Sequence, residues 1–388
     1  MAEPRIRFSK EDGTDYPPLC NATMGCFYTE RNERGGEGLP VLTVSIHSGV
    51  SDGELDEDEL GKRVKRSADL TLYKRAEAGD LVFNMMRAWQ GAVGSVKTTG
   101  MVSPAYIVAK PNSDLDPSFM DYYVQTDSII KRFNRLSYGA LDFRKRLYWD
   151  SFITTEVNVP ILEEQQKIAD FLLSIDEIIS ASEIEVQNLE TQKKAMMKRI
   201  FSQEIRFKRN DGTEFPAWEK STIDDTCDCL DNLRKPITKS DRESGPYPYY
   251  GSTSIQDYVA GYLFDEPLVL LAEDAGPFMD FWEKPIAQWA EGKFWVNNHA
   301  HVLRPSGNRK FMFYQLQHKD IREFINNPGR GKLNQEDMRK IVVGIPCLEE
   351  QRLIADFLSG FDEAIAAAKK ELELWKELKK GLLQQMFV

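Results

Sequence analysis

The first residues to consider are those that could cleave a phosphodiester bond. Glu291-Gly292-Lys293 fits the Glu-x-Lys pattern of metal-dependent nucleases, and Glu273-Asp274 lies upstream of it. Metal-assisted cleavage needs a clustered set of carboxylates, and no such set can be assembled from the sequence. Three-residue matches are also common by chance. Because the carboxylate cluster is missing from the sequence, we do not expect nuclease chemistry in this chain.

Two further patterns suggest a metal ion or a nucleotide. Cys227-x-Cys229 and His299-x-His301 offer four zinc ligands, but both spacings are shorter than in structural zinc sites, and alternate residues of a strand point to opposite faces. The segment 329–332, Gly-Arg-Gly-Lys, lacks the glycine spacing and the Ser/Thr of a Walker loop. We therefore expect no catalytic residue, metal site or cofactor in this chain.

A catalytic methyltransferase is excluded on similar grounds. It would need a Phe-x-Gly-x-Gly loop for its methyl donor and an Asn/Asp-Pro-Pro-Tyr/Phe motif for chemistry on a base amino group. The nearest strings are Asn327-Pro328-Gly329-Arg330 and Tyr16-Pro17-Pro18-Leu19, and neither fits.

Composition limits the remaining classes of protein. The chain has 388 residues, 41% of them hydrophobic, with 18 Pro and 25 Gly. It is too apolar for a disordered chain and too long for one ordinary domain, so we expect two or three globular units. Its 50 Lys and Arg against 61 Asp and Glu give a net charge of −11. This excludes a histone-like protein but not a local basic groove.

The sequence carries no membrane signal. Residues 1–7 are charged, and the longest strongly apolar run, Leu268–Ala272, is far short of the roughly 20 residues that span a bilayer. The five cysteines are scattered and odd in number, which is typical of reduced thiols. We expect a cytoplasmic protein that does not bind a membrane.

An internal repeat organises the chain. Residues 160–202 align without a gap on residues 346–388, with 18 of 43 positions identical. Each copy has a proline just before its start and acidic residues in its first turn, which predicts a long helix. Lys193 and Lys379 interrupt the apolar stripe at matching places.

Apolar residues recur every 3.5 residues in both predicted helices, which is typical of a coiled coil. The two helices are therefore expected to pack on each other as an antiparallel coiled coil about 60 Å long. The alternative is that each helix packs on the core of its own domain. The predicted helix and partner interface consists of Ile168, Leu172, Ile175, Ile179, Leu189, Ile354, Leu358, Phe361, Ile365, Leu372 and Trp375.

A fainter repeat precedes each helix. Ile6-Arg7-Phe8 and Asp12-Gly13-Thr14 recur as Ile205-Arg206-Phe207 and Asp211-Gly212-Thr213. We predict an α+β chain in which two globular mixed α/β domains alternate with two long helices, in a pseudo-twofold arrangement. The predicted bounds are 1–158 for the first domain, 159–203 for the central helix, 204–344 for the second domain and 345–388 for the C-terminal helix.

The motif Pro-x-Leu-Glu-Glu-Gln-x-x-Ile-Ala-Asp-Phe-Leu starts at Pro160 and again at Pro346. This pattern, twice preceded by a globular domain, resembles the specificity (S) subunit of type I restriction–modification systems, the HsdS family. Segments 84–92 and 247–251 also look like parts of that family's target-recognition domains.

The resemblance implies a non-catalytic specificity subunit of a DNA methyltransferase/endonuclease complex. Each globular domain would read one half of a bipartite DNA target, and the helices would set the spacer and dock methyltransferase subunits. The implied partners are double-stranded DNA, two methyltransferase (M) subunits and, through the complex, motor-nuclease (R) subunits. S-adenosylmethionine, ATP and Mg²⁺ would then be held by those partners.

Each globular segment is mildly acidic. Residues 1–158 hold 20 basic and 23 acidic residues, and 203–345 hold 19 and 22. DNA binding must therefore rely on local patches, and we expect the isolated chain to bind DNA weakly. Arg and Gln can contact guanine and adenine edges in pairs of hydrogen bonds. The candidate DNA-binding residues are Lys65, Arg66, Asn84, Arg87, Trp89, Gln90, Arg144, Lys145, Arg146, Arg234, Lys235, Tyr250, Ser252, Arg330 and Lys332.

Several of these candidates have a second interpretation. A basic run is often a solvated face, and the run 62–66 follows the acidic run 54–59, which also fits a charge-balanced loop. Trp89 equally fits a core position. For the whole chain, the alternative to a DNA reader is a coiled-coil protein-interaction scaffold without DNA readout.

Overall fold

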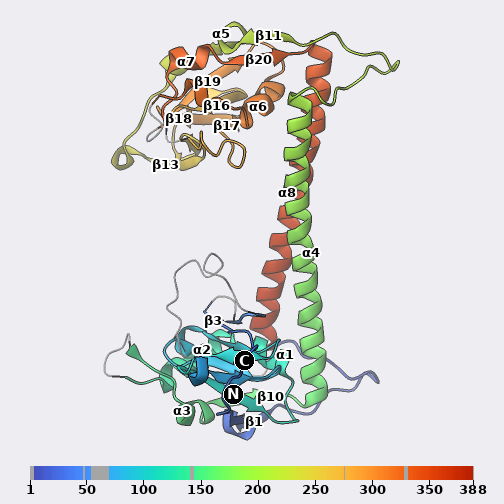
Figure 1. The fold of residues 1–388 in the computed structure, drawn as a ribbon, viewed down its shortest axis with the longest axis vertical. Coiled ribbons are helices and arrows are strands. Elements are labelled where there is room, and N and C mark those ends of the chain that lie inside the picture. Colours follow the sequence, from blue (N-terminus) through green and yellow to red (C-terminus); the bar gives the residue numbers. More distant parts are fainter. Residues whose placement is uncertain are drawn as a thin grey trace. The chain divides into compact units, whose positions relative to one another are not determined.

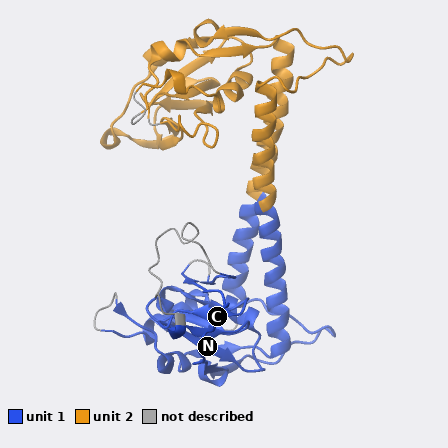
Figure 2. Cartoon of the chain, in the orientation of Figure 1, with its two compact units in different colours: residues 1–183, 371–388 blue, residues 184–370 orange. Residues whose placement is uncertain are grey.

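The computed structural model describes residues 4–46, 49–53, 70–139, 144–274, 276–326 and 331–387. The chain divides into two compact units, one of residues 1–183 and 371–388 and the other of residues 184–370 (Figure 2). Each unit contains one globular domain and half of each long helix. The unit boundaries fall inside the helices, whereas the predicted domain bounds follow the helix ends.

Unit 1 is built on a four-stranded antiparallel sheet in the order β2-β9-β6-β7. Leu81, Val82 and Phe83 of β6 are all buried, because helices cover one face of the sheet and short strands cover the other. Its strands are β1 (Cys20–Thr23), β2 (Tyr28–Glu30), β3 (Val44–Ser45), β4 (Gly49–Val50), β5 (Lys74–Ala76), β6 (Leu81–Asn84), β7 (Val93–Ser95), β8 (Gly100–Val102), β9 (Tyr106–Pro111) and β10 (Glu156–Val159). Its shorter helices are α1 (Pro117–Val124), α2 (Asp127–Leu136) and α3 (Trp149–Ile153), with 3₁₀ turns η1 (Met24–Cys26), η2 (Leu70–Leu72) and η3 (Ala88–Gln90).

Unit 2 repeats this plan with the antiparallel sheet β12-β19-β16-β17 and adds a second sheet, β14-β13-β18-β15. All five residues of β16 are buried. Its strands are β11 (Glu219–Thr222), β12 (Cys227–Cys229), β13 (Ser244–Tyr250), β14 (Ile255–Val259), β15 (Phe264–Asp265), β16 (Leu268–Ala272), β17 (Ala287–Ala290), β18 (Lys293–Val296), β19 (Ala300–Pro305) and β20 (Val342–Ile345). Its shorter helices are α5 (Ile223–Thr226), α6 (Arg309–Gln317) and α7 (Gln335–Arg339), with 3₁₀ turns η5 (Asp231–Leu233), η6 (Lys239–Asp241) and η7 (Arg322–Phe324).

Each unit leads into its long helix in the same way. The antiparallel pairs β1–β10 and β11–β20 come just before α4 (Leu162–Phe201) and α8 (Leu348–Met386). In the first turn a buried glutamate accepts from an arginine, Glu164 from Arg7 at 2.6 Å and Glu350 from Arg206 at 2.7 Å. Since a buried carboxylate is costly unless it is paired, these pairs hold the segments that precede the two domains against the two helices.

The two chain ends complete the repeat. In unit 2 the backbone N–H of Ile205 donates to the carbonyl of Arg199 at 3.1 Å, across the turn that follows α4. In unit 1 the N–H of Ile6 donates to the carbonyl of Gln385 at 3.2 Å, at the end of α8. The N-terminal segment therefore docks on the C-terminal helix as if the chain continued from one to the other.

Within each unit, the two helix halves lie side by side and run in opposite directions (Figure 1). In unit 1 Lys379 pairs with Asp176 and Lys376 with Glu183. In unit 2 Lys193 pairs with Asp362 and Lys369 with Glu190. These pairs confirm the predicted antiparallel pairing of the two helices. The mixed α/β class is confirmed as well.

Each of the two lysines that interrupt the apolar stripe contacts an aspartate that also binds a tyrosine. We call this set of three residues the Tyr–Asp–Lys clamp. In unit 1 the Tyr122 hydroxyl donates to Asp176 at 2.6 Å, and Lys379 reaches the same carboxylate at 2.5 Å. In unit 2 Tyr314 donates to Asp362 at 2.6 Å, and Lys193 reaches it at 2.6 Å. Each ammonium also lies 5.1–5.2 Å from the ring centroid of its tyrosine. The clamp joins α1 or α6 to both helices.

The predicted helix interface residues divide into two groups. Ile168 and Leu172 belong to the core of unit 1, and Ile354 and Leu358 belong to the core of unit 2. The first turns of each helix therefore pack on their own domain, as the alternative interpretation expects. The others are Ile175 and Leu372, which are buried, and Ile179, Leu189, Phe361, Ile365 and Trp375, which are half-buried.

Among the described residues, no helix is both long and apolar enough to cross a membrane.

The clamp predicts an order of stability effects. The Lys193 side chain is 11% exposed and that of Lys379 is 25% exposed. Asp362→Ala would leave the more buried lysine without its carboxylate, so we expect a loss of about 1–3 kcal/mol in unfolding free energy. Asp176→Ala should cost less. Urea unfolding followed by circular dichroism measures both, with exposed Glu185→Ala as the matched control. Equal effects for all three variants would contradict a structural role for the clamp.

Candidate nucleic-acid interface

The candidate surface of unit 1 begins at the loop that follows β6. The Asn84 side chain accepts from the backbone N–H of Met86 at 3.0 Å, and Gly91, with φ of 102°, ends η3 in a conformation that favours glycine. Arg87 and Gln90 lie between these two points and are exposed. The loop is therefore ordered by its own backbone while it presents a guanidinium and an amide to solvent.

Trp89 has a structural part in this loop. Its indole N–H donates to the carbonyl of Met86 at 2.9 Å, and the side chain is half-buried. The polar edge of Trp89 is therefore used within the loop. Of the two interpretations given to this residue by the sequence, the geometry favours a scaffold position over a base contact through the indole N–H.

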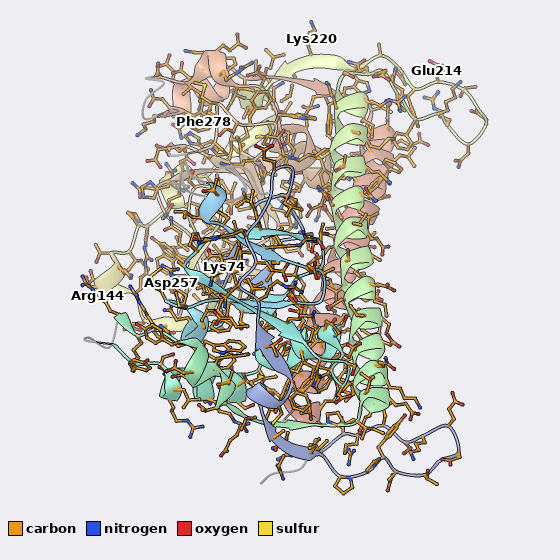
Figure 3. All side chains as sticks on the ribbon, turned by 60° about the horizontal axis from the view of Figure 1, so that its bottom comes forward. Lys74, Arg144, Glu214, Lys220, Asp257 and Phe278 are labelled. Carbon is orange, nitrogen blue, oxygen red and sulfur yellow. The ribbon has the colours of Figure 1, made fainter. Side chains whose placement is uncertain are left out.

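The segment 144–146 lies beside the same loop. The backbone N–H of Arg146 donates to the carbonyl of Tyr138 at 3.0 Å, and the N–H of Tyr138 donates to the carbonyl of Arg146 at 3.1 Å. The N–H of Leu147 donates to the carbonyl of Met85 at 2.9 Å. The structure thus brings together two candidate segments that are more than 50 residues apart in sequence. Arg144 lies on the side of unit 1 away from α4 (Figure 3). We call residues 84–90 and 144–148 the loop face of unit 1.

One aromatic residue of this surface was not among the predicted ones. Tyr138 is 53% exposed, and its ring lies 4.8 Å from that of Tyr148. An exposed aromatic pair beside arginines is suited to contact a nucleic acid. Its place in the sequence, a few residues before the basic run 144–146, was the available signal.

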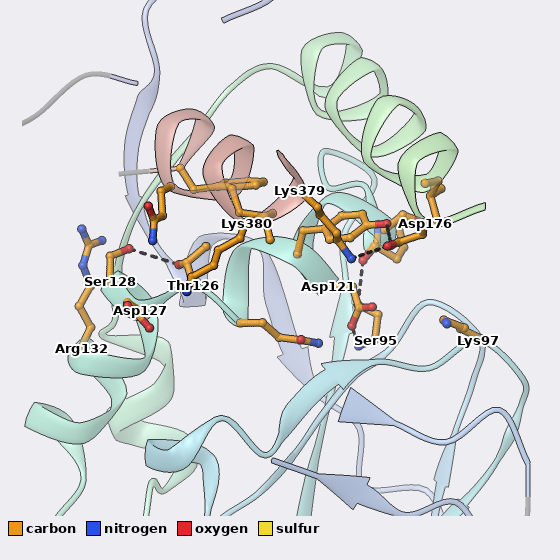
Figure 4. A pocket seen from close by; sticks show the side chains of 18 of the residues that line it. Ser95, Lys97, Asp121, Thr126, Asp127, Ser128, Arg132, Asp176, Lys379 and Lys380 are labelled. Carbon is orange, nitrogen blue, oxygen red and sulfur yellow. Dashed lines mark hydrogen bonds and ion pairs between the residues drawn. The ribbon is translucent and has the colours of Figure 1, made fainter. Parts of the chain in front are cut away.

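A basic groove in unit 1 was also not predicted. It encloses about 1110 Å³ and is lined by α1, α2 and the end of α8, with Lys97, Lys131, Arg135, Lys379 and Lys380 among its residues (Figure 4). Asp121 lies in it and accepts from the N–H of Ser95 at 2.7 Å, and burial raises the pKa of this carboxyl group. The spacing of Lys131, Arg132 and Arg135 on one helical face was the signal available in the sequence.

In unit 2 the candidates converge on Glu273 and Asp274. Arg234 donates to Glu273 at 2.6 Å and to the carbonyl of Ala300 at 2.7 Å, and its side chain is only 14% exposed. Lys332 lies 3.4 Å from Glu273 and is half exposed. Glu273 is therefore paired with two cations of the chain, and Arg234 holds loops together from the inside.

His301 closes the same network. Its Nδ1 lies 2.6 Å from Asp231 and its Nε2 2.9 Å from the carbonyl of Leu333. Both ring nitrogens of His301 therefore lie within hydrogen-bond distance of oxygen atoms of the chain. Burial alone would raise the pKa of Asp231, but the hydrogen bond and charge of His301 outweigh it and hold that pKa below its usual value.

This network also bears on the metal question. Asp231, Glu273 and His301 offer ligand atoms within 4.8 Å of one another, as the one such group among the described residues. A metal ligand needs an unprotonated ring nitrogen, whereas both nitrogens of His301 are engaged and Arg234 lies 3.3 Å from Asp231. The geometry therefore fits an internal ion-pair network better than a metal site.

The remaining candidates of unit 2 lie around this network. Ser252 donates to the carbonyl of Asp274 at 2.5 Å, and the ring of Tyr250 packs edge-on against Phe294. Lys235 has an exposed side chain, while its carbonyl accepts from the indole N–H of Trp295. Lys235 and Lys332 are thus candidates that combine exposure with a fixed backbone. Lys65, Arg66 and Arg330 lie outside the described residues.

Comparison with known protein sequences finds a family model and several related proteins. A family model described as the type I restriction modification DNA specificity domain matches residues 217–374. A Haemophilus influenzae protein assigned as a type I restriction enzyme specificity subunit is 36% identical over 144 residues, which are 37% of this chain and 37% of that protein. A Methanocaldococcus jannaschii protein assigned as the MjaX specificity subunit is 22% identical over 388 residues, which cover 92% of this chain and 88% of that protein. The chain thus spans little more than a third of the first relative and most of the second.

Solved structures match along the whole chain. The S subunit of a type I restriction–modification system from M. genitalium covers 100% of this chain and 99% of its own length, with a TM-score of 0.62 and 13% identity. At that identity the likeness concerns the fold alone. The fold agrees with the sequence matches to specificity domains and subunits. Residues 217–374 thus match the type I restriction modification DNA specificity domain, and the chain as a whole has the fold of a solved type I S subunit.

Proposed function

We propose that this chain is the non-catalytic subunit that selects the DNA target of a type I restriction–modification complex, and that each unit reads one half of a bipartite target. The observation that carries the proposal is the duplicated framework with unlike loops. Both units share one sheet order, one helix start and one Tyr–Asp–Lys clamp, whereas the loop face of unit 1 has no sequence counterpart in unit 2.

The loop face of unit 1 has the chemistry for direct readout. Arg87 and Gln90 are exposed on a loop whose backbone is fixed by Asn84 and Gly91. Arg and Gln are the side chains that bind guanine and adenine edges through paired hydrogen bonds. The neighbouring residues 144–146 supply positive charge suited to phosphate contacts. In unit 2, Lys235 and Lys332 are the corresponding exposed cations.

The two helices are proposed to set the spacer and to dock methyltransferase subunits. Both are unbroken, with 40 and 39 residues, and four lysine–carboxylate pairs hold their register. A helix lengthens by about 1.5 Å per residue, so its length can be converted into a spacing along DNA. The partners that we propose are double-stranded DNA, two methyltransferase subunits and, through the complex, motor-nuclease subunits, with S-adenosylmethionine, ATP and Mg²⁺ on those partners.

Single substitutions should alter one half of the target at a time. Arg87→Ala should relax the first half-site only, and Lys235→Ala the second only, because losing one paired base contact costs about 1–3 kcal/mol of discrimination. Mapping methylated bases in the genome of a host that carries the chain with its methyltransferase measures this. A change in both half-sites, or in neither, would contradict the assignment.

Two control variants separate readout from folding. Lys110 is exposed on β9, at the end of the β6–β9 ladder opposite the Arg87 loop, so Lys110→Ala should leave both half-sites unchanged. Arg234 lies within the ion-pair network, so Arg234→Ala should lower the thermal stability of unit 2. Lys235→Ala should leave that stability unchanged.

A paired insertion tests the role of the helices. Seven residues added after Val186 and seven after Leu372, which are matched positions of the repeat, lengthen both helices by about 10 Å. The recognised spacer should then grow by up to about three base pairs, since base pairs stack about 3.4 Å apart. Both half-sites should stay the same.

The insertion needs a control of equal length. The same seven residues placed after Ser113, in the exposed turn between β9 and α1, should leave the spacer unchanged. A spacer that does not respond to the paired helix insertion, in a complex that still methylates DNA, would show that the helices do not measure it.

A further inference from the structure

A duplicated chain allows two kinds of surface to be told apart. A surface that meets a different target in each unit is free to differ between the units. A surface that meets the same partner twice must be the same in both, even where no packing requires it. Exposed positions that are identical in both halves without a structural reason therefore indicate a surface that meets the same partner twice.

The first shared surface feature is a hairpin that precedes each domain, residues 9–15 in unit 1 and 208–214 in unit 2. The backbone N–H of Lys10 donates to Thr14 at 2.8 Å, and that of Arg209 donates to Thr213 at 2.8 Å. Each tip, Asp-Gly-Thr, is exposed. Figure 3 labels Glu214 in the hairpin of unit 2, which projects away from the sheets. Turn geometry explains the identity of the tip, but not why a projecting hairpin of one length occurs in both units.

Each hairpin is fixed to the outer side of its own long helix. The rings of Phe8 and Phe171 lie 5.6 Å apart and edge-on, and those of Phe207 and Phe357 lie 5.6 Å apart in the same geometry. Phe171 is nevertheless 36% exposed. An aromatic pair that is only partly covered therefore lies beside each hairpin.

The exposed face of each helix next to this pair carries the same charges. Asp170 and Glu177 of α4 are exposed, and so are their repeat equivalents Asp356 and Glu363 of α8. Residues seven apart lie on one face of a helix. The helix dipole accounts for acidic residues in the first turn only, and these positions lie two or more turns further along. Neither packing nor helix stability requires them.

We propose that each unit docks one copy of the same partner polypeptide on its hairpin surface. In unit 1 this surface consists of residues 9–15, Asp170, Phe171 and Glu177, and in unit 2 of residues 208–214, Asp356, Phe357 and Glu363. The partner meets it with basic side chains opposite the carboxylates and an apolar side chain on the phenylalanine, which is 36% exposed in unit 1 and half-buried in unit 2. The inference deepens the proposed function and rests on it, because the methyltransferase subunit is the partner expected in two copies.

The experiment is a count of partners. The full chain is co-expressed with the methyltransferase subunit encoded beside it, and native mass spectrometry gives the number of copies bound. Wild type should bind two. Asp170→Arg with Glu177→Arg should bind one, as should Asp356→Arg with Glu363→Arg, with at least a tenfold loss of the two-partner species. All four substitutions together should bind none. Two partners on each of these variants would overturn the proposal.

Two control variants, which should both keep two partners bound, test whether the loss of a partner is specific to the charge reversals. Exchanging hairpins 9–15 and 208–214 should leave two partners bound, because the inference treats them as equivalent; loss of a partner would contradict it. Asp170→Glu should also keep both. A variant that merely misfolds would not lose one partner and keep the other.

The outcomes also separate this inference from the proposed function. If wild type binds two partners but methylates no DNA, the proposed function fails and docking stands. If wild type methylates a bipartite target while the charge-reversed variants retain two partners, the docking surface alone fails.

Discussion

The rest of the structure depends on one constraint, which is that a lysine within a helix seam must reach a carboxylate. Lys193 and Lys379 each lie in an otherwise apolar stripe and each meet an aspartate of the other helix, which also accepts from a tyrosine of α1 or α6. Because a buried ammonium without a counter-charge is costly, sliding one helix along the other is opposed in each unit. The same contact ties the globular domain to the helices, so register and domain orientation within a unit are set together.

This constraint is consistent with the division of labour that we propose. The framework of each unit is repeated, from the arginine–glutamate pair at the helix start to the clamp itself. Loops that grow out of the framework differ, and surface on the outer side of the helices is repeated. A net charge of −11 is compatible with this proposal, because local basic groups such as those at residues 144–146 can supply phosphate contacts without an overall positive charge.

The sequence predicted what periodicity and repetition encode. The two long helices and their antiparallel pairing followed from the heptad spacing and the offset of 186 between the copies. Contacts between distant segments could not be read from the sequence. The link between Met85 and Leu147, the enclosure of Arg234 by Glu273 and the role of Lys193 and Lys379 all depend on which elements meet in three dimensions. The exposure of single residues could not be predicted either. Tyr138 is exposed although no periodic pattern around it indicated this, and Arg234 is enclosed although its sequence resembled that of a surface cation.

The most direct test of DNA target selection is a binding selection with the chain and its methyltransferase on a library of random DNA duplexes, read by sequencing. Our account predicts that the enriched molecules share two short blocks separated by a run of fixed length in which every base is accepted. A single continuous block, or no enrichment by a complex that demonstrably forms, would contradict it and would favour a protein-interaction scaffold.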